Sequence, residues 1–303
     1  MTPIHTLVFQ AMFVIAIKKV SEYTRPVLFI SRYYGSTEIQ PGLATLFFVN
    51  ADGWALTCRH VVQEIAAEQQ IANRRTAFEA ELAATKGKLS RNSRKKIEEK
   101  HGLVPTAVFE HRVSFAFGGS GPINWNCHVD SNHDVALLHF PGFSTSWCST
   151  FPTFGTNGGD LQPGKTICRL GYPFPEFTNF AYDAKSDTIN WTSTGSTNIP
   201  RFPIDGLVSR LVLDGGTLGG FELTTPGLRG QSGGPAFDTE GKIWGMQSQT
   251  CHLDLNFDVE QNVLRQGKKK KINSYPFLHA GRCVHVDVLK DFMRLHKVAF
   301  AEG

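Results

Sequence analysis

The feature that most restricts the fold is a succession of short apolar segments separated by glycine, proline and Asp-Gly turns. One runs over 27–34 ("VLFISRYY"), and a pair at 43–50 ("LATLFFVN") and 54–58 ("WALTC") flanks Asp52-Gly53, a strong hairpin signal. Further segments of strand length occur at 107–117, 134–140, 165–174, 208–214, 220–225, 241–249 and 281–288. Many short strands with regular turns predict a mainly β protein built as a barrel or a sandwich.

Two segments depart from this pattern and predict helices. Residues 61–101 are rich in Ala, Glu, Lys and Arg, and we expect Gly87 to divide them into two helices. Residues 286–300 form an amphipathic pattern at the C-terminus. The apolar positions of the first segment are separated by seven, four and seven residues, which is a helical stripe: Ile71, Phe78, Leu82 and Leu89.

Charge restricts the class of protein. A formal net charge of +4 over 303 residues is too small to indicate a nucleic-acid-binding protein. The basic residues gather at 86–100 and in "RQGKKKK" (265–271), where we expect an exposed loop between two strands. The first cluster is either a solvated helical face or a docking site for a regulatory protein.

Cysteine usage and the N-terminus bear on location. The six cysteines form no CxxC pair, which predicts free thiols and a cytoplasmic protein. Residues 6–17 are apolar, but twelve residues are too few to span a bilayer, which needs about 20. Lys18 and Lys19 follow the apolar run, whereas a signal peptide would place its charge first. We expect a buried strand or short helix there rather than a membrane anchor.

The sequence "GLRGQSGGPAF" (227–237) places Ser232 among four glycines. An ordinary turn explains the glycines and the proline. The alternative is a nucleophile on a tight turn, with the backbone N–H groups of Gly230 and Ser232 aimed at an oxyanion. That function requires a histidine base and a carboxylate that orients it.

Suitable partners occur earlier in the chain. His60 ("TCRHVV") stands where a strand gives way to a helical pattern, and Asp134 ("NHDVALLHF") directly precedes an apolar run. Each on its own has an ordinary structural explanation, but together with Ser232 they follow the chain order His, Asp, Ser of one known triad arrangement. Cys127, His128 and His133 lack a fourth ligand, so we expect no metal and no cofactor.

The segments "LATLFFVNADGWALTCRHVV", "HDVALLHF" and "GQSGGPAF…GKIWGMQ" resemble the signature regions of trypsin-like serine peptidases, closest to the bacterial high-temperature-requirement (Deg-type) branch. The resemblance implies two antiparallel β-barrels: residues 1–150 with His60, Asp134 and the helical insertion, and residues 151–303 with Ser232 and a terminal helix. It implies His60 as general base, Asp134 as orienting carboxylate and Ser232 as nucleophile, with the oxyanion hole described above. We expect no PDZ domain.

Two departures from the family shape the expected function. Gln231 stands where digestive trypsins have the Asp that receives a newly cut N-terminus, so that activation route is not expected. The resemblance places the substrate-binding pocket at Pro226, Arg229, Ser248 and Thr250, without the acidic residue that would select Lys or Arg. We therefore expect a protein or peptide substrate with a moderate apolar or polar side chain before the cleaved bond. The enzyme is either constitutive or latent until a partner binds, and the competing function is a silent protease-like binding module.

Overall fold

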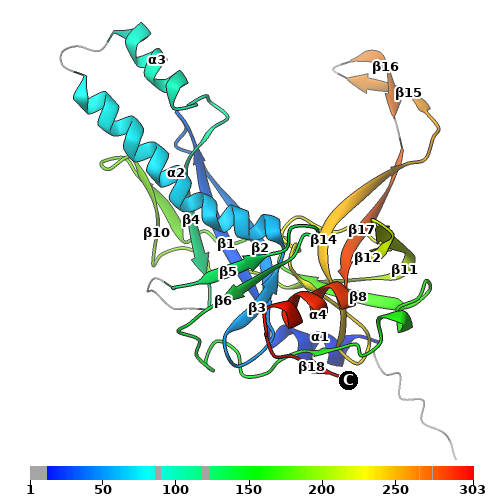
Figure 1. Ribbon diagram of the computed structural model, residues 1–303. Helices are drawn as coiled ribbons and strands as arrows, with labels where there is room; N and C mark the ends of the chain where they lie inside the picture. The colour runs from blue at the N-terminus through cyan, green and yellow to red at the C-terminus, as the bar shows by residue number, and fades with distance from the viewer. Residues whose placement is uncertain (1–11, 86–89, 118–122, 266, 275) are drawn as a thin grey trace, which may run out of the picture.

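The computed structural model describes residues 12–303 except 86–89, 118–122, 266 and 275 (Figure 1). Strands dominate this part of the chain, which confirms the prediction of a mainly β fold. The helices within it are α1 (Val14–Ser21), α2 (Arg59–Ala84), α3 (Arg91–Lys100), α4 (Val286–Leu295) and a 3-10 turn at Gly158–Asp160.

The N-terminal half contains one antiparallel sheet of six strands in the order β4-β1-β2-β3-β6-β5. The Asp-Gly hairpin is present between β2 and β3, where Phe48 pairs with Ala55. Gly53 has a φ of +82°, and a Cβ there would lie 2.6 Å from the backbone oxygen of Phe140, so the turn needs glycine. The strands are β1 (Thr24–Tyr33), β2 (Ile39–Phe48), β3 (Trp54–Thr57), β4 (Val108–Phe115), β5 (Asn126–Val129) and β6 (Ala136–His139).

The C-terminal half contains a sheet of eight strands in the order β13-β8-β11-β12-β17-β14-β7-β18. An additional pairing of β13 with β14 closes six of these strands into a barrel. One large apolar core joins the two sheets, and in it the Phe47 ring lies 6.5 Å from that of Phe154. The strands are β7 (Thr153–Phe154), β8 (Thr166–Gly171), β11 (Phe202–Asp214), β12 (Thr217–Leu223), β13 (Pro235–Phe237), β14 (Lys242–Asp254), β17 (Phe277–His285) and β18 (Ala301–Glu302). The division near residue 150 remains a prediction.

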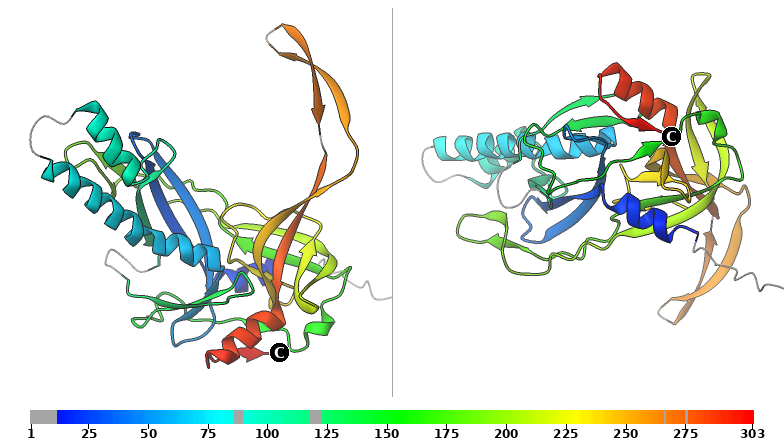
Figure 2. Two further views of the ribbon diagram at one scale, coloured as in Figure 1. Left: turned by 45° about the horizontal axis from the view of Figure 1, so that its top comes forward. Right: turned by 90° about the horizontal axis from the view of Figure 1, so that it is seen from below.

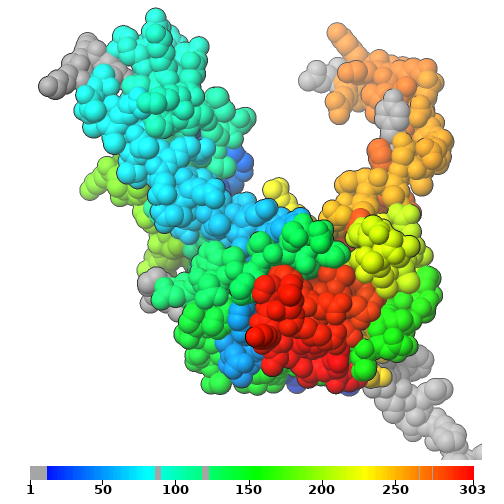
Figure 3. Space-filling model, viewed as in Figure 1, coloured from blue at the N-terminus to red at the C-terminus, as the bar shows by residue number. Residues whose placement is uncertain are grey.

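Two arms extend from this body on either side of an open space (Figures 2 and 3). The first is formed by α2 and α3. Its inner part packs on β4, where Phe78, Leu103 and Phe109 form a small separate core. The predicted stripe is confirmed for Phe78 and Leu82, which join this core, whereas Gly87 and Leu89 lie outside the described residues.

The second arm is a β-hairpin, and it shows that the prediction of a loop at 265–271 was wrong. The basic segment is not a loop: Lys268–Ser274 forms β16, which pairs with β15 (Val259–Arg265) at the end of the long β14–β17 hairpin (Figure 1). A run of lysines hides the alternation that marks a strand, and Gly267, at a φ of +75°, supplies the turn. The segment is exposed, as expected. A second two-stranded ribbon consists of β9 (Phe180–Asp183) and β10 (Thr188–Trp191).

The chain ends differ partly from the expectations. The apolar N-terminal run continues into the short helix α1, in which Ala16 and Val20 are buried, while residues 1–11 lie outside the described part. The C-terminal helix α4 ends at Leu295 rather than at residue 300, because the chain turns into β18. No helix in the described part of the chain is both long and apolar enough to cross a membrane.

Candidate active site

His60 lies in the first turn of α2, which begins two residues earlier than the sequence pattern indicates. Cys58 is the N-cap residue of this helix and makes no side-chain capping bond. The carboxylate of Asp134 provides the missing acceptor, because the His60 backbone N–H donates to its Oδ1 at 3.1 Å. An anion at a helix N-terminus is stabilised by the free N–H groups and the helix dipole. Asp134 therefore fixes the start of α2 as well as the imidazole.

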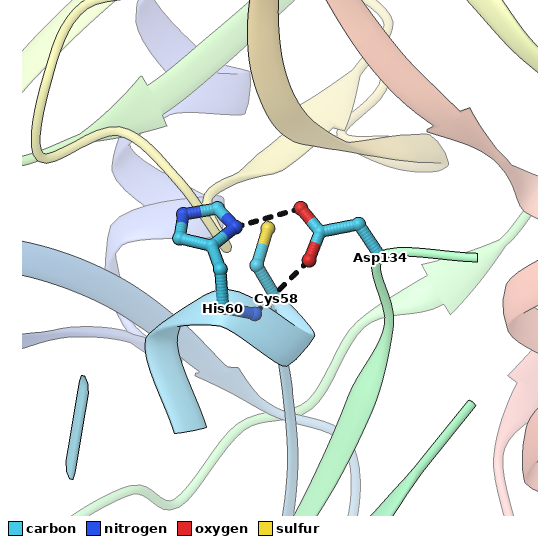
Figure 4. Close-up of side chains that lie close together, drawn as sticks. All are labelled: Cys58, His60 and Asp134. Atoms are coloured by element: carbon cyan, nitrogen blue, oxygen red, sulfur yellow. Dashed lines mark hydrogen bonds and ion pairs between the residues drawn. The ribbon is translucent and has the colours of Figure 1, made fainter. Parts of the chain in front are cut away.

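The His60 ring also contacts Asp134. Its Nδ1 lies 2.8 Å from Asp134 Oδ2, and the second ring nitrogen points away from the carboxylate (Figure 4). The hydroxyl of Ser248 donates to the same Oδ2 at 2.7 Å. Burial opposes ionisation of Asp134, but the hydrogen bonds from His60 and Ser248 outweigh it and lower the pKa of its carboxyl to about 2. Asp134 is therefore a carboxylate at neutral pH, held against an imidazole that is half exposed.

Ser232 lines the same cleft as His60. This cleft has a volume of about 590 Å³ and is also lined by Gly230 and Arg229. The Ser232 hydroxyl donates to the backbone oxygen of Ser248 at 3.2 Å. Among the described residues it makes no hydrogen bond to His60, although catalytic hydrogen bonds are often long or unmade without substrate.

The turn around Ser232 is held by contacts with both halves of the molecule. Thr45 of β2 donates its N–H to Ser232 O at 3.0 Å and its hydroxyl to Gly230 O at 2.7 Å. Gly230 has a φ of +96°, and a Cβ there would lie 2.4 Å from Tyr172 O. In the described part of the chain, neither the Gly230 N–H nor the Ser232 N–H has a protein acceptor. These glycines therefore permit a backbone shape that leaves two donors free.

Gln231 is fully buried and its amide is satisfied locally. Its Oε1 accepts from the Leu228 N–H at 3.1 Å, and its Nε2 donates to Phe202 O at 3.1 Å. The Gln231 amide is neutral and already has two hydrogen-bond partners, so it does not require the positively charged amino group of a cut N-terminus. That a cut N-terminus does not activate the protein remains a prediction.

The residues expected around the substrate lie on two segments beside Ser232. Pro226 and Arg229 belong to the segment that leads into the turn, and Ser248 and Thr250 belong to β14. The hydroxyl of Thr250 donates to Gly227 O at 2.6 Å, which ties the two segments together. Ser248 has a role that the sequence did not indicate, because its hydroxyl supports Asp134 while its carbonyl faces Ser232.

One group of side chains in the described part of the chain has metal-ligand spacing: Cys58, His60 and Asp134. Burial raises the pKa of the Cys58 thiol well above its usual value, and the thiol contacts Gln247 O at 3.2 Å. Both Asp134 oxygens already accept hydrogen bonds, from His60 and from Ser248. This donor set favours proton transfer over metal binding. Of the trio considered from sequence, His133 contacts Asp130 instead, while Cys127 and His128 lie on β5.

Comparison with known proteins identifies the fold. A family model described as a trypsin-like peptidase domain matches residues 44–246. Among solved structures, the HtrA-type protease AlgW with a decapeptide has a TM-score of 0.48 at 10% identity, and AlgW with a tripeptide has 0.45 at 12% identity. Each covers 92% of this chain, which spans 65% and 61% of their respective lengths. No curated protein matches the sequence. Because the family model covers more than half of the chain, the chain belongs to the trypsin-like peptidase family.

Proposed function

We propose that this protein is a serine endopeptidase that cleaves protein or peptide substrates through an acyl-enzyme intermediate. The observation that carries the proposal is that His60 is hydrogen-bonded to Asp134 and lines the same cleft as Ser232. Ser232 Oγ attacks the peptide carbonyl while His60 takes its proton and then passes it to the leaving amine. Asp134 holds the ring by Nδ1 and stabilises the imidazolium that forms. These residue roles remain proposals.

The oxyanion hole consists of the N–H groups of Gly230 and Ser232 in this proposal. Both lack protein acceptors among the described residues, and they lie on the turn that carries the nucleophile. Pro226, Arg229, Ser248 and Thr250 flank the substrate side chain that precedes the cleaved bond. Loss of one oxyanion donor typically lowers the rate about 100- to 1000-fold.

We further propose that the protein is latent until a partner or substrate reorganises the site. Two contacts support this: Ser232 donates to Ser248 O rather than to His60, and Thr250 donates to Gly227 O between the two segments beside Ser232. A regulatory partner would act through the 61–101 arm, since α2 carries His60 in its first turn.

The basic face of that arm is partly neutralised by its own acids. Arg94 pairs with Glu98, Lys95 with Glu99, and Lys100 with Glu81. Two further basic residues of α3, Arg91 and Lys96, are exposed and form no ion pair within the described residues. The double variant Arg91→Glu/Lys96→Glu should preserve basal cleavage and remove stimulation by a partner. Equal stimulation of the wild type and the double variant would indicate that α3 is only a solvated helical face.

The central proposal is tested by labelling with a fluorophosphonate, which reacts only with an activated serine. The protein should gain one adduct, located on Ser232 by peptide mapping, and Ser232→Ala should gain none while its melting temperature stays nearly unchanged. His60→Ala is the second control, since it removes the base and keeps the serine. A folded protein that is never labelled, with or without peptide substrates, would indicate the silent binding module instead.

A further inference from the structure

Arg169 of β8 is fully buried. The other buried charged groups are paired: Arg32 lies 2.6 Å from Glu110, and Lys290 lies 3.1 Å from Asp287. Among the described residues Arg169 forms no ion pair, and its Nε has no hydrogen-bond partner at all. Burial of a cation without a counter-charge is unfavourable, so a buried and unpaired guanidinium calls for an explanation.

The guanidinium lies against the two segments that flank Ser232. Its Nη2 donates to Thr225 Oγ1 at 2.6 Å and to the backbone oxygens of Thr225 and Pro226, each at 3.1 Å. Its Nη1 donates to Gln247 Oε1 at 2.6 Å. Gln247 directly precedes Ser248, whose carbonyl accepts the Ser232 hydroxyl. Arg169 therefore bridges the two segments that flank Ser232.

Two glycines lie close to the Arg169 guanidinium and to its partner Gln247. A Cβ on Gly281 of β17 would lie 2.0 Å from Arg169 Nη1, and a Cβ on Gly227 would lie 2.3 Å from Gln247 Nε2. Side chains at these two positions would therefore occupy the space beside the guanidinium. With glycine at both, the neutral amide of Gln247 is the group that stands in front of Nη1.

An amide oxygen is a weaker partner for a guanidinium than a carboxylate, which forms shorter charge-assisted hydrogen bonds. Burial lowers the pKa of Arg169, but an arginine side chain remains charged. A substrate carboxylate that displaced the Gln247 amide would supply the missing counter-charge. Such displacement also requires the Thr250–Gly227 bridge to open, so the pocket would form as the substrate enters.

We propose that Arg169 is the specificity-determining residue of the primary pocket and that the protein cleaves after acidic residues, Asp or Glu. The substrate carboxylate takes the place of Gln247 Oε1 on the guanidinium. This inference rests on the proposed peptidase function. It replaces the expectation of an apolar or polar side chain at this position with an acidic one.

The experiment uses a series of peptidyl diphenyl phosphonates that differ only in the side chain placed in the primary pocket: Glu, Asp, Gln, Val and Lys. The rate of adduct formation on Ser232 is followed by intact mass. The Glu probe should react about 10- to 100-fold faster than the isosteric Gln probe, the range expected for hydrogen bonds to a charged group.

Two variants distinguish recognition from a purely structural role. Arg169→Gln should bring the Glu-to-Gln ratio close to one. Gln247→Glu places a carboxylate on the guanidinium within the fold, so it should also abolish the preference while the melting temperature is maintained or raised. A structural role alone predicts that Gln247→Glu leaves the ratio unchanged, and that result would overturn the proposal.

The remaining outcomes separate this inference from the proposed function. Fastest labelling of Ser232 by the Val, Gln or Lys probe would refute acidic specificity and leave the peptidase function intact. Failure of every phosphonate and of the fluorophosphonate to label Ser232, with and without peptide substrates, would refute the peptidase function, and the specificity with it.

Discussion

Replacement of Asp134 by Asn tests both the stability and the chemistry of the site. The folded-state pKa of the carboxyl is lowered from an ordinary value of 3.8 to about 2. A difference of this size corresponds to about 2 kcal/mol, since one pKa unit is about 1.4 kcal/mol. Because the pKa is depressed on folding, this contribution is present above pH 3.8 and is lost as the pH falls through about 2.

The assay is urea unfolding of the wild type and Asp134→Asn at pH 7, 5 and 3. The free energy of unfolding should differ by about 2 kcal/mol at pH 7 and 5, and about half of that difference should remain at pH 3. Asp52→Asn is the matched control, because Asp52 is exposed in the β2–β3 turn. A difference between the wild type and Asp134→Asn that does not change between pH 7 and 3 would refute the assignment of the stabilisation to an ionised carboxylate.

The same variant should lower the rate of Ser232 labelling by about 1000- to 10,000-fold, because Asn favours the wrong imidazole tautomer. This effect is expected at all pH values above about 4, where the wild-type carboxylate is ionised. Labelling within tenfold of the wild type would show that Asp134 holds the helix start but does not assist His60.

Three further predictions concern the nucleophile turn and the thiols. Thr45→Val removes the hydroxyl that holds Gly230 O; stability should fall by about 1–3 kcal/mol and labelling should slow, whereas unchanged labelling would show that the turn holds itself. Gly230→Ala forces a side chain into a φ of +96° against Tyr172 O; a folded but unreactive protein is expected by calorimetry and labelling, and full reactivity would contradict the proposed oxyanion hole. All six cysteines are unpaired in the structure, so alkylation of protein unfolded without reductant should modify all six by mass, and fewer would reveal disulfides.

The sequence by itself predicted many of the strands, the first hairpin and the candidate site residues. These features depend on local rules: strand-length apolar runs, the Asp52-Gly53 turn, and glycines where φ is positive or backbones approach closely. Of the three candidate residues, His60 and Ser232 line one cleft, and Asp134 is hydrogen-bonded to His60 and Ser248. Local rules failed for β16, because a strand of exposed lysines has no apolar alternation to detect.

Only the tertiary structure decided which groups support the site. Thr45 holds the Ser232 turn from 185 residues away along the chain, and the Ser248 hydroxyl reaches Asp134 across 114 residues. The sequence also did not predict that Arg169 is buried without an ion-pair partner among the described residues. An arginine within an apolar segment does not indicate which side chains will lie opposite it in the fold. The contacts of Thr45 and Ser248 join the N-terminal and C-terminal halves of the molecule. How the two halves pack together depends on the whole core, whereas the conformation of a turn or a strand depends on a few neighbouring residues.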